Sequence, residues 1–119
     1  DNFFHLLSNC WDGRKMDALL LLYPVSRKPD ENLGDYRKDG NGRIYRRKGL
    51  DFSPYVFTGA QILHDRLFKK SPRKPFSLVS LYDRAEKSGR LFGLVYNGIW
   101  HDVGTKDKLR RIRKNIRML

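Results

Sequence analysis

A continuous apolar run, ALLLLYPV at residues 18–25, constrains the fold of this chain more than any other feature. No charged side chain interrupts the run, which follows Asp17 and contains Pro24 near its end. Uninterrupted apolar runs of this length are typical of strands buried on both faces, usually at the centre of an α/β sheet. A helix is disfavoured because the run is short and holds a proline. The run is also far too short to span a bilayer.

Strand and helix patterns alternate along the rest of the chain. Two further strands are predicted, at Tyr55–Thr58, where Gly59 ends the strand, and at 91–98. A hairpin is predicted around the tight turn at 39–42. Helices are predicted at 3–11, at 60–68, at 76–90 with Ser77 as cap and Gly89 as stop, and at 106–119 with Thr105 as cap. This alternation predicts an α/β fold, with residues 1–119 as a single unit.

The chain is strongly basic. It has 25 Lys and Arg residues against 13 Asp and Glu residues, a net charge of +12 and a pI of about 10.1. Such a balance favours anionic partners, among them nucleic acid, nucleotide phosphates and sugar phosphates. The basic residues form three clusters, at 43–48, at 69–74 and in the last helix. No helix-turn-helix, zinc or RNA-recognition motif accompanies them, so a solvated basic surface is favoured and nucleic acid is not the expected partner.

The cysteine content of the chain indicates its cellular compartment. Cys10 is the single cysteine, so the chain cannot form an internal disulfide, and a reducing, cytoplasmic location is expected. Cys10 lies beside Trp11 in an apolar stretch, which predicts a buried thiol without a catalytic role. The sequence shows no signal peptide and no segment that predicts a membrane partner.

Asp102 is the acidic residue that invites a functional interpretation. It lies in IWHDVGT, between the strand predicted at 91–98 and the last helix. Ligands gather at the carboxyl ends of strands in α/β sheets, and a carboxylate there can hold a divalent cation against phosphate oxygens. The alternative is a loop acid that interacts favourably with the helix dipole. The residues alone favour this second interpretation.

The order of motifs resembles the C-terminal half of bacterial sugar-1-phosphate nucleotidyltransferases. The resemblance covers nearly the whole chain. Within the family, the chain is most similar to the N-acetylmuramate-1-phosphate uridylyltransferases and the mannose-1-phosphate guanylyltransferase-like proteins. Its most specific part is W-x-D-V-G-T before a helix, and the next is GDY before the D-x-x-G-R hairpin. The resemblance implies a Rossmann-like three-layer α/β sandwich with a mixed sheet.

The resemblance also implies an activity. In that family a sugar 1-phosphate attacks the α-phosphorus of a nucleoside triphosphate, which gives a nucleotide sugar and pyrophosphate. Two aspartates hold Mg²⁺, and Asp102 matches the second of them, which would make it both metal ligand and catalytic residue. The matching sugar-phosphate residues are Gly34 and Asp35 in the GD turn, Thr58 and Gly59 at a strand end, and Arg46 or, in our assignment, Arg47.

One family motif is missing from these 119 residues, and a second is at most partly present. The nucleotide-binding loop of type G-x-G-T-R-x-x-P and its following lysine do not occur, and Asp1-Asn2 could be the tail of the first metal-binding motif or could follow it. We therefore expect an acceptor-side unit that lacks the N-terminal nucleotide-binding half and is inactive alone, with that missing half as a possible partner. The rival interpretation is a non-catalytic basic α/β module that binds nucleic acid or an acidic protein. A third is a degenerate remnant without activity.

Overall fold

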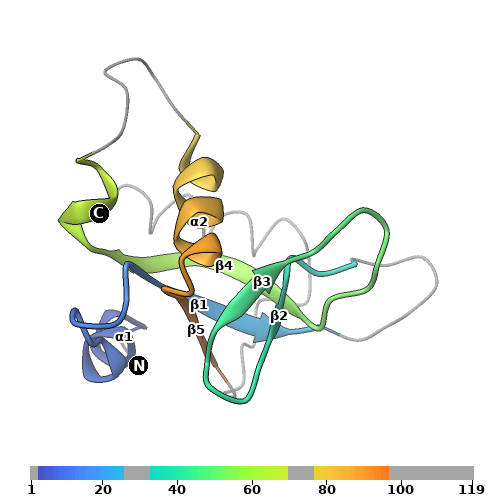
Figure 1. Cartoon of the computed structure of the whole chain (residues 1–119). Helices are drawn as coiled ribbons and strands as arrows, with labels where there is room; N and C mark the ends of the chain where they lie inside the picture. Colours follow the sequence, from blue (N-terminus) through green and yellow to red (C-terminus); the bar gives the residue numbers. More distant parts are fainter. Residues whose placement is uncertain (1–2, 26–32, 70–76, 97–119) are drawn as a thin grey trace.

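The computed structural model describes residues 3–25, 33–69 and 77–96. Figure 1 shows these residues as one sheet with a helix on each side. The helices are α1 (Phe3–Cys10), the short 3₁₀ helix η1 (Asp65–Leu67) and α2 (Leu78–Lys87). The strands are β1 (Ala18–Pro24), β2 (Tyr36–Lys38), β3 (Ile44–Arg46), β4 (Tyr55–Leu63) and β5 (Leu91–Val95).

The five strands form one mixed sheet in the order β3-β2-β4-β1-β5. β1 is parallel to β5 and antiparallel to β4, and the hairpin strands β2 and β3 are antiparallel. The apolar run at 18–25 therefore forms a strand with a neighbour on each side, as the sequence predicts. Its residues from Ala18 to Leu22 are at most 2% exposed. The prediction of an α/β fold is confirmed.

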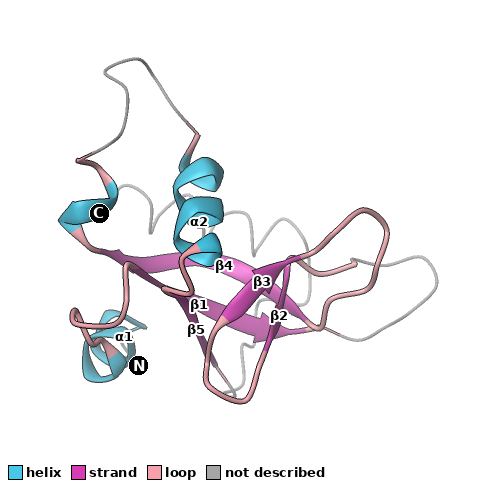
Figure 2. Cartoon of the chain, viewed as in Figure 1, coloured by secondary structure: helices cyan, strands magenta, loops and turns pink. Residues whose placement is uncertain are grey.

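Alternate residues of β1 contact opposite layers, as the two-residue period of a strand requires. Ala18, Leu20 and Leu22 belong to a core that includes Tyr82 and Ala85 of α2. Leu19 and Leu21 belong to a second core, which includes Leu7 of α1. The sheet thus lies between two helical layers, which Figure 2 shows as cyan helices on opposite sides of the magenta strands. The expected three-layer arrangement is confirmed.

The structure differs from the sequence prediction at β4. Gly59 does not end this strand, which continues to Leu63, and the helix predicted at 60–68 is reduced to the three residues of η1. The register changes from Leu22↔Phe57 to Leu20↔Gln61, so that three residues, 58–60, lie opposite the single residue Leu21. Gly59 adopts a φ of 98° within this bulge. Pairing with β1 overrides the local helical spacing of the segment.

The predicted hairpin is confirmed, and its turn contacts β5, the strand at the opposite edge of the sheet. The Asp39 carboxylate accepts hydrogen bonds from the backbone N–H groups of Asn41 and Arg43, which fixes the turn. The N–H of Gly93 in β5 donates to the carbonyl of Gly42 at 2.9 Å. The hairpin therefore links the two ends of the sheet order and encloses the core on the α2 side.

Both flanking helices form where the sequence predicts them. Ser77 caps α2, since its hydroxyl accepts from the N–H of Val79, and Gly89 follows the helix with a φ of 71°. One expectation on α1 is wrong, because Cys10 is exposed. The helix turns this residue away from the core, which Leu7 enters. None of the described helices is long and apolar enough to cross a membrane, and the helix predicted at 106–119 lies outside the described residues.

Candidate functional site

A pocket of about 480 Å³ opens between the hairpin, β4 and the first turn of α2. Three elements that are distant in sequence meet there, because β2 pairs with the first residue of β4 while α2 covers this face of the sheet. The pocket lining combines charged, hydroxyl and apolar side chains, which come from Asp35, Tyr36, Arg46, Arg47, Phe57, Ser77, Leu78, Val79 and Tyr82. A mixed lining of this kind suits a ligand with both apolar and anionic parts.

The Gly34-Asp35 turn forms one corner of the pocket. Gly34 has a φ of 81°, and a Cβ atom on it would lie 1.8 Å from the carbonyl oxygen of Ser53. Asp35 joins the hairpin to β4, because its N–H donates to the carbonyl of Tyr55 at 2.7 Å and its carboxylate accepts from the N–H of Phe57 at 2.8 Å. The backbone at this corner is thereby held in one arrangement, with the Asp35 carboxylate at the pocket.

The two arginines of the pocket have different surroundings. Arg46 donates two hydrogen bonds of 2.8 Å to the carboxylate of Asp83, and this contact raises the pKa of Arg46. Arg47 donates through Nε to the carbonyl of Gly34 at 2.9 Å. Within the described part of the chain, the two terminal nitrogens of Arg47 donate no further hydrogen bond. Arg47 is therefore the pocket cation best able to contact an anionic ligand.

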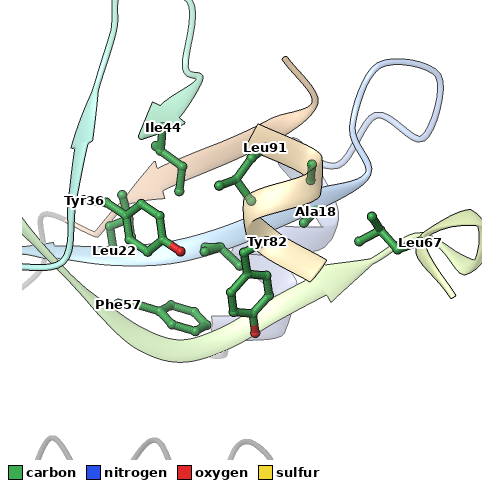
Figure 3. Close-up of a cluster of buried hydrophobic side chains, with 10 residues drawn as sticks. Ala18, Leu22, Tyr36, Ile44, Phe57, Leu67, Tyr82 and Leu91 are labelled. Atoms are coloured by element: carbon green, nitrogen blue, oxygen red, sulfur yellow. The ribbon is translucent and has the colours of Figure 1, made fainter. Parts of the chain in front are cut away.

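Aromatic rings form the apolar wall. Figure 3 shows Tyr36, Phe57 and Tyr82, from three different elements, gathered at one end of the buried cluster. The rings of Phe57 and Tyr82 meet edge to face, with centroids 5.7 Å apart. Burial raises the pKa of Tyr36, and the nearby Tyr82 and Asp83 raise it further. Tyr36 is therefore a neutral phenol at physiological pH.

The first turn of α2 closes the remaining side of the pocket through Ser77, Leu78 and Val79. Ser77 uses its hydroxyl as helix cap, at 3.1 Å from the N–H of Val79. The N-terminal turn of a helix carries a partial positive charge, which adds to that of Arg47 on the opposite side. The pocket thus combines Arg47 and a helix N-terminus with the carboxylate of Asp35 beside an aromatic wall.

The structure brings some of the predicted site residues together and leaves others apart. Asp35, Arg46 and Arg47 line the pocket. Gly34 is not a lining residue, but its carbonyl accepts a hydrogen bond from Arg47. Thr58 does not line it, since its side chain is fully buried and its hydroxyl donates to the carbonyl of Leu21 at 2.9 Å. The roles assigned to these residues stay predictions.

Two predicted site residues, Gly59 and Asp102, are not among the residues that line the pocket in the described part of the chain. Gly59 occupies the bulge next to Thr58 and is not among the lining residues. Asp102 lies outside the described residues, as does Asp1. Among the residues that the structure describes, no three His, Cys, Asp or Glu side chains come together as a metal site would require. The assignment of Mg²⁺ to Asp102 therefore stays a prediction.

Sequence reasoning missed most of the apolar lining. Phe57 precedes the predicted Thr58, and the alternation of side chains along a strand could have shown that only one of these neighbours faces α2. Ser77 is the helix cap, as the sequence predicts, and Tyr82 lies on the buried face of α2. Their second position, at the pocket, depends on where α2 crosses the sheet, and no local pattern carries that information.

The basic cluster at 43–48 is largely engaged within the protein. Arg43 donates to the carbonyl of Gly89 at 2.8 Å and lies over the ring of Phe92. Arg46 is paired with Asp83, and Arg47 is hydrogen-bonded to Gly34. These contacts order three guanidinium groups around the hairpin, which is a different arrangement from a row of extended, solvated arginines that follows a nucleic-acid backbone.

Comparisons with known proteins agree with the resemblance seen in the motifs. No protein-family model matches the chain. The chain is 28% identical over 95 residues to the N-acetylmuramate α-1-phosphate uridylyltransferase of Caulobacter vibrioides. The match covers 79% of this chain and 39% of that protein. The chain is thus similar to part of a sugar-1-phosphate nucleotidyltransferase.

A solved structure shares the fold. It is a crystal structure, in complex with sucrose, of a Bacillus anthracis protein described provisionally as a glucose-1-phosphate thymidylyltransferase. The TM-score is 0.55 at 21% sequence identity, over 98% of this chain and 48% of that chain. The expected resemblance and the expected fold class are therefore confirmed. The chain spans less than half the length of either of these proteins.

Proposed function

We propose that this chain is the acceptor-side part of a sugar-1-phosphate nucleotidyltransferase, and that the pocket beside the hairpin holds the sugar 1-phosphate. The observation that carries the proposal is the meeting of Asp35 and Arg47, from the GDY hairpin motif, with the aromatic wall. Similarity to the uridylyltransferase and to the fold of the Bacillus anthracis protein supports the reaction class.

Different pocket residues would contact different parts of the sugar 1-phosphate. The terminal nitrogens of Arg47 would donate to the phosphate oxygens, and the first turn of α2 would add its partial positive charge. The rings of Tyr36 and Phe57 would cover an apolar face of the sugar. The carboxylate of Asp35, which lines the pocket, would accept hydrogen bonds from sugar hydroxyls.

In the proposed reaction a phosphate oxygen of the sugar 1-phosphate attacks the α-phosphorus of a nucleoside triphosphate. An α-phosphorus–oxygen bond forms, the bond to the bridging oxygen breaks, and pyrophosphate leaves with the electron pair. We propose Asp102 as the Mg²⁺ ligand; a bound magnesium ion would neutralise the charge that develops on the phosphates. The nucleotide side of the site would come from outside these 119 residues, so the chain alone would be inactive. The reaction would take place in the cytoplasm.

The test measures sugar-phosphate binding and turnover together. Isothermal titration of the 119-residue chain with a hexose 1-phosphate should show binding that Arg47→Met weakens about 10–100-fold, because charge-assisted hydrogen bonds contribute about 1.5–3 kcal/mol. In the complete natural protein, pyrophosphate release from a nucleoside triphosphate and the sugar phosphate should require Mg²⁺ and should be lost in Asp102→Asn.

Arg37→Met is the matched control, since Arg37 lies in the same hairpin, is exposed and is not among the pocket-lining residues. It should bind the sugar phosphate as the unmodified chain does. An equal loss of affinity in both variants would show that binding depends only on the overall positive charge of the chain. No pyrophosphate release from any pair of nucleoside triphosphate and sugar 1-phosphate would refute the proposed reaction.

A further inference from the structure

The hairpin of β2 and β3 supplies one side of the pocket, yet its base pairs with the sheet at a single position. That position is Tyr36↔Tyr55, between β2 and β4. Asp35, the preceding residue, adds two hydrogen bonds to β4. All of these contacts lie at the base of the hairpin. They hold the base, and other contacts must set the direction in which the hairpin extends over the sheet.

A second attachment joins β3 to α2. Glu86 accepts a hydrogen bond from the backbone N–H of Arg46 at 2.7 Å, and Asp83 pairs with the Arg46 guanidinium. The side chains of this ion pair are 49% and 42% exposed. Exposed ion pairs contribute little to holding a structure together. This attachment by itself would therefore hold β3 against α2 only weakly.

The third attachment lies at the tip of the hairpin, where Arg43 is half-buried. Arg43 donates through Nε to the carbonyl of Gly89, just after α2, at 2.8 Å, and its guanidinium lies 5.3 Å from the ring centroid of Phe92. The backbone N–H of Gly93 donates to the carbonyl of Gly42 at 2.9 Å. The tip is thus joined both to the end of α2 and to β5.

The sheet leaves space for this tip. Ile44, the residue after Arg43, is 1% exposed and belongs to the core that α2 covers. Figure 3 shows it in the same cluster as Leu91 of β5. A Cβ atom on Gly93 would lie 2.5 Å from Cγ2 of Ile44. The hairpin can approach β5 this closely because residue 93 has no side chain.

The attachments of the hairpin follow one another along α2. Arg43 contacts the segment after the C-terminal end of the helix. Arg46 contacts Asp83 and Glu86 in its second half. Arg47 and the first turn of α2 then line the pocket together. The hairpin and α2 therefore run side by side, and the pocket opens beyond the last contact between them.

We propose that Arg43 is a positioning residue for the sugar 1-phosphate site. By fixing the hairpin tip to the end of α2, it holds Arg46 and Arg47 at the distance from the first turn of α2 that the ligand requires. Arg43 is not among the pocket-lining residues, so it acts through these two arginines and does not touch the ligand. Its effect on binding rests on the proposed function, whereas its effect on the hairpin does not.

Amide hydrogen exchange of the complete natural protein tests the effect on the hairpin without any ligand. Arg43→Met should raise the exchange rate of the Arg46 amide at least about 10-fold, because β3 then leaves α2 more often. The Asp35 amide, which is bonded to β4 at the base, should stay within about 2-fold.

Two further variants separate the hydrogen bond from the charge. Arg37→Met removes the same charge from the same hairpin, where Arg37 lies over the ring of Tyr45, and should leave the Arg46 amide unchanged. Arg43→Gln also removes the charge, but it keeps an N–H donor as many bonds from the backbone as Nε of arginine. It should therefore retain the slow exchange. Equal exchange at Arg46 in Arg43→Met and Arg37→Met would overturn the proposal.

Steady-state kinetics of the complete protein test the effect on the site. In Arg43→Met the KM for the sugar 1-phosphate should rise about 5-fold, which corresponds to about one hydrogen bond, while the KM for the nucleoside triphosphate stays within about 2-fold. A general loss of structure would raise both values. Arg43→Gln should restore the KM for the sugar 1-phosphate. Equal changes in the two KM values would contradict a positioning role.

Gly93→Ala tests the same tip from the side of β5 and decides if Arg43→Met does not fold. Its Cβ would displace Ile44, so the Arg46 amide should again exchange faster while the Asp35 amide does not. An unchanged Arg46 amide in Gly93→Ala would overturn the proposal.

The outcomes for the hairpin and for the reaction are distinguishable. Faster exchange at Arg46 in Arg43→Met alone, without any pyrophosphate release, would support the positioning of the hairpin and refute the proposed reaction. Pyrophosphate release with an unchanged KM for the sugar 1-phosphate in Arg43→Met would support the reaction and refute the positioning role.

Discussion

At the residue scale, Gly34 is the position that most restricts the pocket corner. Its φ of 81° and the 1.8 Å approach that a Cβ would make to the Ser53 carbonyl leave room for glycine alone. The obstacle is backbone, which cannot rotate away as a flexible side chain can. The GD motif is thus explained by packing and conformation at Gly34, whatever ligand the pocket holds.

We expect Gly34→Ala to lower the free energy of unfolding by more than about 2 kcal/mol, because the left-handed conformation and the backbone overlap both oppose a side chain. Gly40→Ala is the control, since Gly40 is in the same hairpin, has no heavy atom within 4 Å of a built Cβ and does not have a positive φ. It should change the stability by less than about 1 kcal/mol. Urea unfolding followed by circular dichroism measures both, and similar values for the two variants would contradict this account.

At the element scale, α2 depends on its first turn for both stability and pocket shape. Its N-terminus projects to the pocket rim, and Ser77 supplies the cap. The buried face of the helix, with Leu81, Tyr82 and Ala85, fixes its position on the sheet. The cap therefore governs the local order of the turn, while the buried face holds the rest of the helix.

Ser77→Ala should destabilise the protein by about 1 kcal/mol, because the N–H of Val79 loses its hydrogen-bond acceptor. It should also raise the exchange rate of the first-turn amides more than that of amides near Ala85. Ser77→Thr keeps a hydroxyl cap and should stay close to the unmodified protein. Thermal unfolding and hydrogen exchange distinguish the two, and a loss spread evenly over α2 would argue against a capping role.

At the scale of the whole molecule, Asp17 holds three segments together where β1 begins. Its carboxylate, 11% exposed, accepts from Arg90 before β5 at 2.8 Å and from Arg66 in η1. Arg66 also donates to the carbonyls of Gly13 and Met16. Burial by itself would raise the pKa of Asp17, but the hydrogen bonds and charges of Arg90 and Arg66 outweigh burial and lower it below 3.8.

This ion-pair network predicts a specific acid dependence. Because the folded-state pKa of Asp17 is lowered, the stabilisation by its carboxylate is complete above the unfolded-state pKa of about 3.9 and is lost as pH falls through the folded-state pKa. Asp17→Asn should cost roughly 2 kcal/mol at pH 7 and much less at the lowest pH. Urea unfolding from pH 7 down to about 2 measures this, with the exposed Asp12→Asn as control. A pH-independent cost would contradict the assignment.

Much of the fold could be predicted from sequence because it depends on local signals. The apolar run of β1, the Asp39–Gly42 turn of the hairpin and the Ser77 cap of α2 are all features of short segments, and the structure confirms each of them. The order of strands and helices likewise indicates the α/β class, and the similarity to a nucleotidyltransferase follows from the order of motifs.

The tertiary structure alone decided the extent of β4, the orientation of Cys10 and the composition of the pocket. The segment after Gly59 has helical spacing, but it pairs with β1 because the hydrogen bonds and burial gained along a central strand exceed the local preference. Cys10 faces outward because the orientation of α1 on the sheet is set by Leu7. The pocket joins Arg47, Phe57 and Ser77 across gaps in sequence, and contacts between distant segments exist only once the sheet and α2 have packed together.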